Sequence, residues 1–288
     1  MHTKPSPCGV QRALLRYAVA ASIGCACWFG SGVAHAQKEQ DREPRVAILA
    51  YHRFNSTTAA DSMTVRVSTF EAQLRFLREH GYRIVPLRDI VNWLVGPQDT
   101  GMPNRAVAFT ADDGHRSVYE VLMPIAVREH VPFTLFIYPS AISNASYALS
   151  WTQLETLQRT GLFDVQSHTY WHPNFNIERA HRTHEDYRRF ATKQLVDSRA
   201  RIEAQLGARV DLLAWPFGIV DPELIEIASA LGYRAAFTIE GRTVDRHASP
   251  LAVSRLLMTD ADSPAVLARR LGEAEPNEHR GTLKERSP

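Results

Sequence analysis

The feature that most constrains the fold is a regular alternation of short apolar runs, rich in β-branched residues, with longer amphipathic runs. The short runs are typical of buried strands, and the longer ones of helices that cover a sheet. Roughly seven or eight such units predict a parallel α/β sheet, as a closed or distorted (β/α) barrel or, alternatively, a doubly wound open sheet. The expected strands are 45–51, 83–86, 106–110, 133–138, 163–167, 212–215, 234–238 and 252–257.

Residues that can cap a helix precede four of the amphipathic runs, and each run ends close to a glycine. A capping side chain accepts a hydrogen bond from a free backbone N–H in the first turn. The expected caps are Ser68 and Ser150, each with Glu or Gln three residues later, Thr183 before 184–206, and Asp221 followed by a proline.

The N-terminus predicts export to the periplasm or the medium. Residues 1–16 are positively charged, 17–33 are uncharged and largely apolar, and 34–36 read Ala-His-Ala, which together are typical of a signal peptide cleaved before Gln37. Two alternatives remain open: an uncleaved membrane anchor, or lipid attachment at Cys25. All three cysteines lie in this segment, so we expect neither a disulfide nor a cysteine metal site in the mature chain.

After a polar linker at 37–44, we expect one catalytic domain over 45–272 and a disordered tail over 273–288. Three of the 33 basic residues lie in the first 36 positions, which contain no acid, so 30 basic residues face 31 acidic ones in the rest. Nucleic acids and anionic lipids require clustered positive charge. The charge balance therefore favours a neutral or weakly charged substrate and no nucleic-acid partner. Because the signal segment is expected to be cleaved, we expect no stable membrane span in the mature chain.

Two adjacent acids, Asp112 and Asp113, follow the expected strand 106–110 and precede Gly114. In an α/β barrel the carboxyl ends of the strands share one mouth, where active sites lie. Neighbouring residues that leave a strand point in different directions, so one carboxylate can bind a cation while the other faces a reacting water. The alternative is an ordinary Asp-Gly turn with solvated acids.

Two histidines, His168 and His172, follow the expected strand 163–167 four residues apart. On helical or tightly turned backbone this spacing brings both imidazoles to one cation. Two histidines and one carboxylate form a ligand set that leaves positions open for water and substrate. Together with Asp113, they predict a metal site.

These motifs resemble the polysaccharide deacetylases of carbohydrate esterase family 4, the NodB-homology fold. The resemblance covers roughly residues 45–258, with 110–114 matching Thr-Phe-Asp-Asp-Gly except for Ala111, and 168–172 matching His-Ser/Thr-x-x-His. It implies a distorted (β/α)7-type barrel, Asp112 as general base, and Asp113, His168 and His172 as ligands of a divalent metal, most commonly Zn²⁺.

Two departures from the family pattern bear on this expectation. The family's arginine that pairs with the base is replaced by Ala214, and 251–258 lacks the histidine that supplies the general acid in many members. The chain instead resembles the subgroup that acts on poly-β-1,6-N-acetylglucosamine, which shares the Trp-Pro-Phe/Tyr-Gly form at 215–218 and an early Tyr-His. By that resemblance His52 is the candidate acid; His115 and His247 are the alternatives.

The resemblance implies hydrolysis of N-acetyl groups from an N-acetylglucosamine-containing polysaccharide, with release of acetate. The proposed oxyanion donor is a backbone N–H near Phe217, and the sugar-binding candidates are Trp215, Pro216, Phe217, Tyr170 and Trp171. The alternative is a carbohydrate-binding protein that keeps the fold without turnover. The absent arginine leaves room for it, whereas the intact Asp112, Asp113, His168 and His172 argue against it. The oligomeric state stays open.

Overall fold

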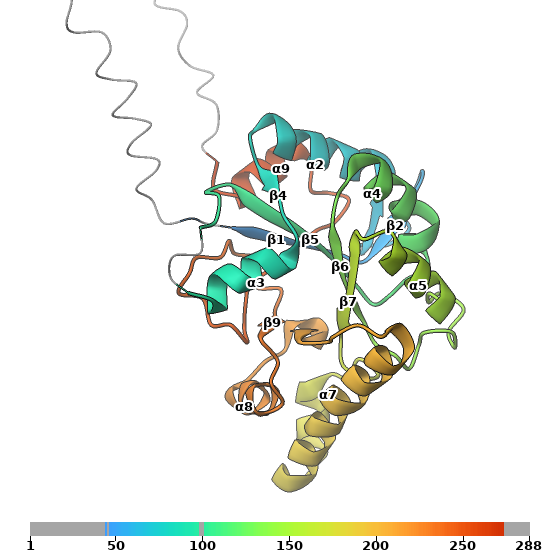
Figure 1. Cartoon of the computed structure of the whole chain (residues 1–288), viewed down its shortest axis with the longest axis vertical. Helices are drawn as coiled ribbons and strands as arrows, with labels where there is room; N and C mark the ends of the chain where they lie inside the picture. Colours follow the sequence, from blue (N-terminus) through green and yellow to red (C-terminus); the bar gives the residue numbers. More distant parts are fainter. Residues whose placement is uncertain (1–43, 45, 98–100, 274–288) are drawn as a thin grey trace, which may run out of the picture. The chain divides into compact units, whose positions relative to one another are not determined.

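Parallel strands form the centre of the structure (Figure 1). The computed structural model describes residues 44, 46–97 and 101–273. Within them one parallel sheet has eight strands. Seven of these follow one another as hydrogen-bonded neighbours, and the eighth, β4 (Arg83–Ile84), lies off this order and pairs with β5. The path runs β10 (Leu256–Leu257), β1 (Ala47–Tyr51), β5 (Ala106–Asp112), β6 (Phe133–Ile137), β7 (Phe163–Ser167), β8 (Leu212–Ala214) and β9 (Ala235–Phe237). Every expected strand is found, and the predicted fold class is confirmed.

The two edges of this path are joined by the chain that follows β9. Phe237 forms a parallel bridge with Val253, the Thr238 N–H donates to the Val253 carbonyl at 2.8 Å, and β10 then pairs with β1. The sheet therefore curls into a distorted barrel. Its sparsest ladder is between β7 and β8, where Ser167 and Leu213 form the only registered pair.

Alternate residues of the strands point to opposite faces of the curled sheet. Every second side chain of the strands, including strands on different sides of the ring, belongs to a single buried cluster. The face that carries these side chains is therefore the inner face of the barrel. Helix α3 (Leu87–Val95) packs Ile90 and Val91 against the same cluster. The inner strand residues include Ile48, Ala108, Phe136, Leu212, Ala214, Phe237 and Val253.

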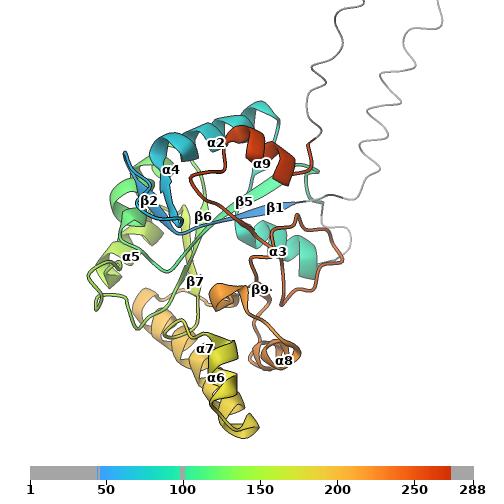
Figure 2. The ribbon, with the colours of Figure 1, turned by 180° about the vertical axis from the view of Figure 1, so that it is seen from behind.

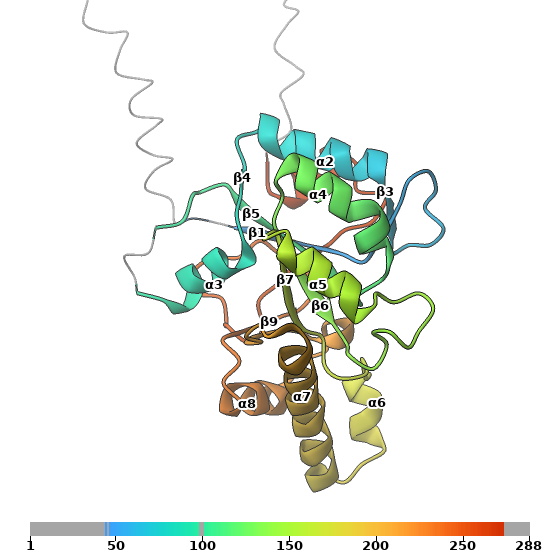
Figure 3. The ribbon, with the colours of Figure 1, turned by 45° about the vertical axis from the view of Figure 1, so that its right-hand side comes forward.

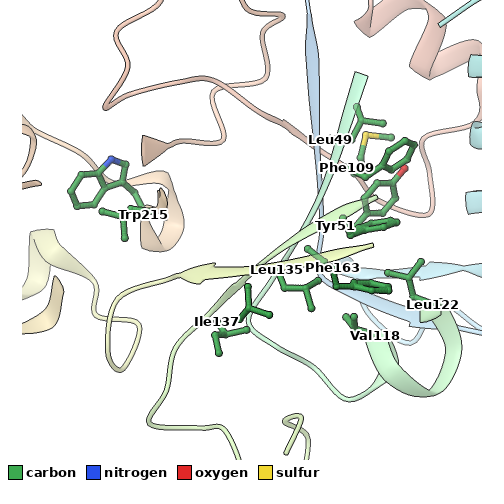
Figure 4. Close-up of a cluster of buried hydrophobic side chains, with 14 of the residues drawn as sticks. Leu49, Tyr51, Phe109, Val118, Leu122, Leu135, Ile137, Phe163 and Trp215 are labelled. Carbon is green, nitrogen blue, oxygen red and sulfur yellow. The ribbon is translucent and has the colours of Figure 1, made fainter. Parts of the chain in front are cut away.

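The outer face of the sheet packs against the surrounding helices through a larger apolar cluster (Figure 4). Aromatic rings dominate part of it: Tyr51 stacks on Phe109 at a centroid distance of 6.0 Å, and Phe70 meets Tyr51 edge-on at 5.6 Å. Complete burial of one such ring contributes roughly 1.5–3 kcal/mol. This layer holds the strand ends in place beneath the mouth of the barrel.

The helices lie around the sheet, with α2 beside α9 and α6 beside α7 (Figures 2 and 3). The described α-helices, besides α3, are α2 (Val67–Glu79), α4 (Met123–Glu129), α5 (Trp151–Arg159), α6 (Phe175–Ala180), α7 (His184–Leu206), α8 (Pro222–Ala230) and α9 (Pro264–Arg270). A π-helical turn, η1 (Val118–Leu122), precedes α4, and a 3₁₀ turn, η2 (Pro216–Gly218), follows β8. In the described part of the chain, no helix has both the length and the apolar character needed to cross a membrane.

Three of the four predicted helix caps are confirmed: Ser150 forms a full capping box with Gln153, and Thr183 and Asp221 accept from the first turns of α7 and α8. The Ser68 prediction is wrong. Helix α2 begins two residues earlier than a cap at Ser68 requires, and its N-cap residue, Arg66, makes no side-chain cap.

The carboxylate of Asp260, 191 residues after Thr69, lies at the start of α2 in place of a local cap. It accepts hydrogen bonds from the Arg66 N–H at 2.9 Å and the Thr69 hydroxyl at 2.7 Å. A second difference is a short parallel pair, β2 (Arg53–Asn55) and β3 (Thr64–Arg66), which the sequence pattern did not predict. Three-residue strands are too short to show a readable alternation.

The predicted signal segment and linker lie outside the described residues except for residue 44, as does the predicted tail from residue 274 onward. Glu273, assigned to the tail, accepts hydrogen bonds from the Tyr82 hydroxyl and Arg105. The described part of the domain therefore includes Glu273.

Candidate active site

Polar side chains from distant parts of the sequence meet at the carboxyl ends of the strands. Asp112 is the last residue of β5 and Asp113 follows it, while His168 directly follows β7. His52 directly follows β1, and its pKa responds to the charges of both aspartates. The expected convergence at one mouth of the barrel is found.

Asp113, His168 and His172 form a set of side chains that could hold a metal ion, with one ligand atom from each lying within 4.8 Å of the others. The Asp113 Oδ1 atom is 3.7 Å from the His168 Nε2 and 3.6 Å from the His172 Nε2. Ligand bonds of about 2.0–2.2 Å at tetrahedral angles separate donor atoms by roughly 3.4 Å. The residues therefore fit a divalent cation.

The His168 ring is fixed in the orientation that a metal ligand requires. Its Nδ1 atom lies 2.7 Å from the Ala214 carbonyl oxygen, so Nδ1 carries the proton and Nε2 keeps its lone pair for a cation. The second imidazole is also prepared: burial, followed by the neighbouring His168, lowers the pKa of His172 to about 4. A neutral ring is the form that binds metal.

The backbone around the site is strained at four positions. Asp113 (φ 72°), Thr169 (φ 66°), His172 (φ 63°) and Phe217 (φ 58°) account for four of the six non-glycine residues with positive φ in the described ranges. Each such residue costs on the order of 1–3 kcal/mol and persists where the surrounding structure enforces it. The left-handed turn at Asp113 explains how two consecutive carboxylates take different directions.

Gly114 follows in the same left-handed conformation, with φ at 71°. A Cβ atom there would lie 3.0 Å from side-chain carbons of both Ile137 and Ile142. The glycine of the Asp-Asp-Gly motif is therefore required both by its dihedral angle and by the close approach of the next strand.

Asp112 is held by a buried arginine, Arg255. The guanidinium donates to both carboxylate oxygens, at 2.8 and 2.7 Å, and Asp112 and Arg255 are 2% and 0% exposed. It also donates to the Thr110 hydroxyl and the Thr238 carbonyl. Burial raises the pKa of the Asp112 carboxyl, but the charges of Arg255 and His168 lower it more, so this pKa lies well below its usual range. Asp112 is therefore an ionised carboxylate.

Arg255 is the functional residue that the sequence reasoning missed. Ala214 stands at the position where the family that the motifs resemble has the arginine that pairs with the base. The Ala214 side chain lies in the inner apolar cluster. The arginine comes instead from the segment that closes the barrel, two residues after Val253. The available signal was one charged residue inside the apolar run 252–257. An unpaired base was the reason for considering a protein without turnover. Because Arg255 pairs with Asp112, that reason no longer holds.

The structure separates the three histidines considered as the acid. His52 lies near Asp112 and Asp113, and its buried Nδ1 atom has no hydrogen-bond partner; burial lowers its pKa, which the two carboxylates partly oppose. His115 bonds the Ser117 hydroxyl through Nδ1 at 2.9 Å. His247 lies three residues after Val244, which bridges Val46 at the amino end of β1, so it belongs to the opposite end of the barrel.

The five residues expected to bind sugar differ in how far their side chains are exposed. Trp215 is 1% exposed and donates its indole N–H to the Leu251 carbonyl, so its ring belongs to the core and cannot stack on a sugar (Figure 4). Pro216 is likewise buried. Phe217 is 56% exposed with its ring centroid 4.6 Å from that of His172, and Trp171 is 42% exposed. Tyr170 is half-buried.

The curled parallel barrel, with acids and imidazoles gathered at its carboxyl end, defines a (β/α)-barrel hydrolase. Residues 99–236 match the polysaccharide deacetylase family. Among curated proteins, it is 21% identical over 241 residues to a poly-β-1,6-N-acetyl-D-glucosamine N-deacetylase of Staphylococcus aureus, covering 78% of this chain and 82% of that protein. A protein of the same name from Staphylococcus epidermidis is 22% identical over 197 residues, covering 66% of each.

Solved structures show the same fold. The structure of IcaB from Ammonifex degensii is similar with a TM-score of 0.68 and 25% identity, covering 79% of this chain and 97% of that one. The deacetylase PplD of Streptococcus pyogenes, solved in complex with acetate, gives a TM-score of 0.69 at 20% identity, covering 80% of this chain and 99% of that one.

Proposed function

We propose that this protein hydrolyses the N-acetyl groups of poly-β-1,6-N-acetylglucosamine in a metal-dependent reaction and releases acetate. The observation that carries the proposal is the convergence of Asp113, His168 and His172 next to the buried Asp112–Arg255 pair. The names of the curated relatives support the choice of glycan.

Asp113, His168 and His172 would hold the cation, and their oxygen and nitrogen donors suit Zn²⁺. When bound, such a cation polarises the acetyl carbonyl and makes a coordinated water acidic at neutral pH. The positions that these three side chains leave open are those for water and substrate.

Asp112 acts as the general base in this proposal. It is ionised because Arg255 faces it, and its Oδ2 atom is 4.0 Å from the His168 Nε2, next to the ligand set. Asp112 takes the proton of the attacking water while Arg255 fixes both carboxylate oxygens. The backbone N–H of Phe217, in the strained turn beside His172, is the assigned donor to the oxyanion.

The amide nitrogen leaves as an amine only after it receives a proton, and His52 is the assigned donor. A protonated imidazole with a lowered pKa gives up its proton readily. Asp112 and Asp113, which raise the pKa of His52, stabilise the protonated form against burial. Breaking the C–N bond then yields acetate and a free glucosamine amine.

The proposal includes export to the periplasm or the medium, because the expected signal segment would carry the enzyme to a polysaccharide outside the cytoplasm.

The test is acetate release from poly-β-1,6-N-acetylglucosamine by the purified chain, after chelation and after addition of Zn²⁺. We expect release to stop on chelation and to return with the metal. Asp112→Asn should keep the metal and lose turnover, whereas Asp197→Asn, on the surface of α7, is the matched control and should behave as wild type. Undiminished release by the chelated protein would overturn the metal dependence, and wild-type turnover by Asp112→Asn would overturn the base.

A further inference from the structure

The loop 168–172, which carries both histidines of the candidate metal site, takes its shape from side-chain hydrogen bonds. Its backbone is left-handed at Thr169 and at His172, with φ angles of 66° and 63°. Such conformations persist where the surrounding structure enforces them. The backbone N–H groups of residues 169–172 all donate to side-chain oxygens, which belong to Ser167, Gln194 and Thr169.

Gln194, on α7, is the acceptor that lies far from this loop in the sequence. Its Oε1 atom accepts the Tyr170 N–H at 3.2 Å and the Trp171 N–H at 3.1 Å. An amide oxygen has two lone pairs, so these two bonds use both. We propose that Gln194 is a positioning residue for the metal site, because it holds His172 at the distance from His168 at which one cation reaches both rings. This role rests on the proposed function, since it requires the two histidines to be metal ligands.

Gln194 belongs to a row of α7 side chains that contact the loop and the strand end before it. Residues four apart lie on one face of a helix, and positions 190, 194 and 198 follow this spacing. The Phe190 ring meets the Trp171 ring at a centroid distance of 5.9 Å, and the Ser198 hydroxyl lies 2.8 Å from the Ser167 hydroxyl. Helix α7 also packs against β7, which fixes this row relative to the strand that precedes the loop.

The two imidazoles are held by different means. His168 directly follows β7, and its Nδ1 atom is bonded to the Ala214 carbonyl oxygen at 2.7 Å. The His172 ring contacts the Tyr138 and Phe217 rings, at centroid distances of 5.3 and 4.6 Å. Ring contacts of this kind are less directional than a hydrogen bond, so the placement of His172 depends on its backbone. That backbone is the part of the loop that Gln194 holds.

Loss of the Gln194 oxygen would leave two backbone N–H groups without an acceptor beside a strained residue. The loop can then relax out of the left-handed conformation and find other partners for these groups. His172 would move away from His168, and the cation would lose a ligand at its best distance. Substitution of groups that orient metal ligands typically lowers metal affinity by about 10–100-fold.

The experiment measures Zn²⁺ affinity by competition with a chromophoric chelator, without any substrate. Gln194→Met has a side chain of similar length and no strong acceptor, and it should bind Zn²⁺ about 10–100-fold more weakly than wild type. Gln194→Glu keeps the acceptor and should bind at least as tightly as wild type. Thr183→Ala is the matched control: it removes a capping hydrogen bond from the same helix, does not touch the loop, and should bind as wild type.

The visible spectrum of bound Co²⁺ gives a second measurement, which reports the arrangement of the ligands. It is needed because the negative charge of Gln194→Glu strengthens cation binding by itself. We expect the wild-type spectrum in Gln194→Glu and in Thr183→Ala, and an altered spectrum in Gln194→Met.

The results distinguish the positioning role from the proposed function. Wild-type protein that binds no Zn²⁺ would overturn the metal site and the proposed function with it. Gln194→Met with wild-type affinity and spectrum, or with a loss equal to that of Thr183→Ala or Gln194→Glu, would overturn the positioning role and leave the function standing.

Hydrogen exchange in metal-free wild type tests the same bonds without a variant and decides the matter should Gln194→Met fail to fold. The Tyr170 and Trp171 amides should exchange at least about tenfold more slowly than in an unstructured peptide, because Gln194 holds them before metal binds. Exchange of both amides at the rate of an unstructured peptide would overturn the role of Gln194.

Discussion

Replacing Arg255 with methionine tests the central electrostatic feature of the site. The change removes two charge-assisted hydrogen bonds, at 2.8 and 2.7 Å, and leaves the Asp112 carboxylate 2% exposed without its counter-ion. Breaking a buried pair in this way costs about 3–5 kcal/mol, because the remaining charge stays desolvated. Against a total stability of roughly 5–15 kcal/mol, this is a large fraction.

The pH dependence of that loss distinguishes an electrostatic role from simple packing. In wild type the pKa of Asp112 lies below its unfolded value, so this group stabilises the fold above the unfolded pKa and the contribution is lost as pH falls. Without Arg255, burial raises the pKa of Asp112, and the sign reverses: the variant is penalised at high pH and recovers as Asp112 becomes protonated. The difference in unfolding free energy between the two proteins should therefore shrink as pH falls from neutral toward about 4.

The assay is urea unfolding of metal-free wild type and Arg255→Met over that pH range. The matched control is Arg189→Met, because Arg189 pairs with Glu185 on the surface of α7 and such a pair is worth about 0–1 kcal/mol. The double variant Arg255→Met/Asp112→Asn should recover part of the loss, since no charge is left unpaired. A cost below about 1 kcal/mol for Arg255→Met, or one that does not change with pH, would refute the reasoning.

Four further outcomes are expected. Asp113→Asn should bind far less Zn²⁺ than wild type, measured by metal analysis after dialysis; full retention would remove Asp113 from the ligand set. The pKa of His172 in the fold, about 4, is below its unfolded value, so metal-free protein should lose up to about 3 kcal/mol of stability as pH falls from 6.5 to 4, and His172→Gln should flatten that dependence in urea titrations. His52→Ala should lower kcat about 10²–10⁴-fold with unchanged metal content, and an unchanged kcat would move the acid role elsewhere. Trp215→Ala should destabilise the fold by about 3–5 kcal/mol in thermal or urea unfolding, since the ring is buried; a stable variant with only weakened glycan binding would contradict this placement.

The sequence predicted the features that are local in the chain or that follow from the general geometry of a barrel. Every expected strand is present because apolar, β-branched runs are a direct record of burial. The grouping of Asp113 with His168 and His172 was also predictable, because the carboxyl ends of parallel strands meet at one mouth.

The features that sequence reasoning missed depend on partners distant in the chain. Ser68 resembles a helix cap, yet Asp260 takes that place from the far end of the domain. Trp215 looks like a sugar-stacking residue beside Pro216 and Phe217, but strand alternation and the Leu251 carbonyl place its ring in the core. No local pattern records which distant group satisfies a given side chain.

Arg255 shows why an absent motif residue is weak evidence for lost activity. The inner face of a barrel is shared by every strand, so a carboxylate on β5 can receive its counter-ion from any strand end that reaches the same level. Here the segment that joins β9 to β1 supplies it: Val253 closes the ring, and Arg255, on the same face two residues later, meets Asp112. No arginine is then needed at Ala214, on the inner face of β8, and the Ala214 carbonyl orients His168. The base requires a positively charged side chain at one position in space. The segment that closes the barrel places the Arg255 guanidinium there, so an arginine on β8 is not required.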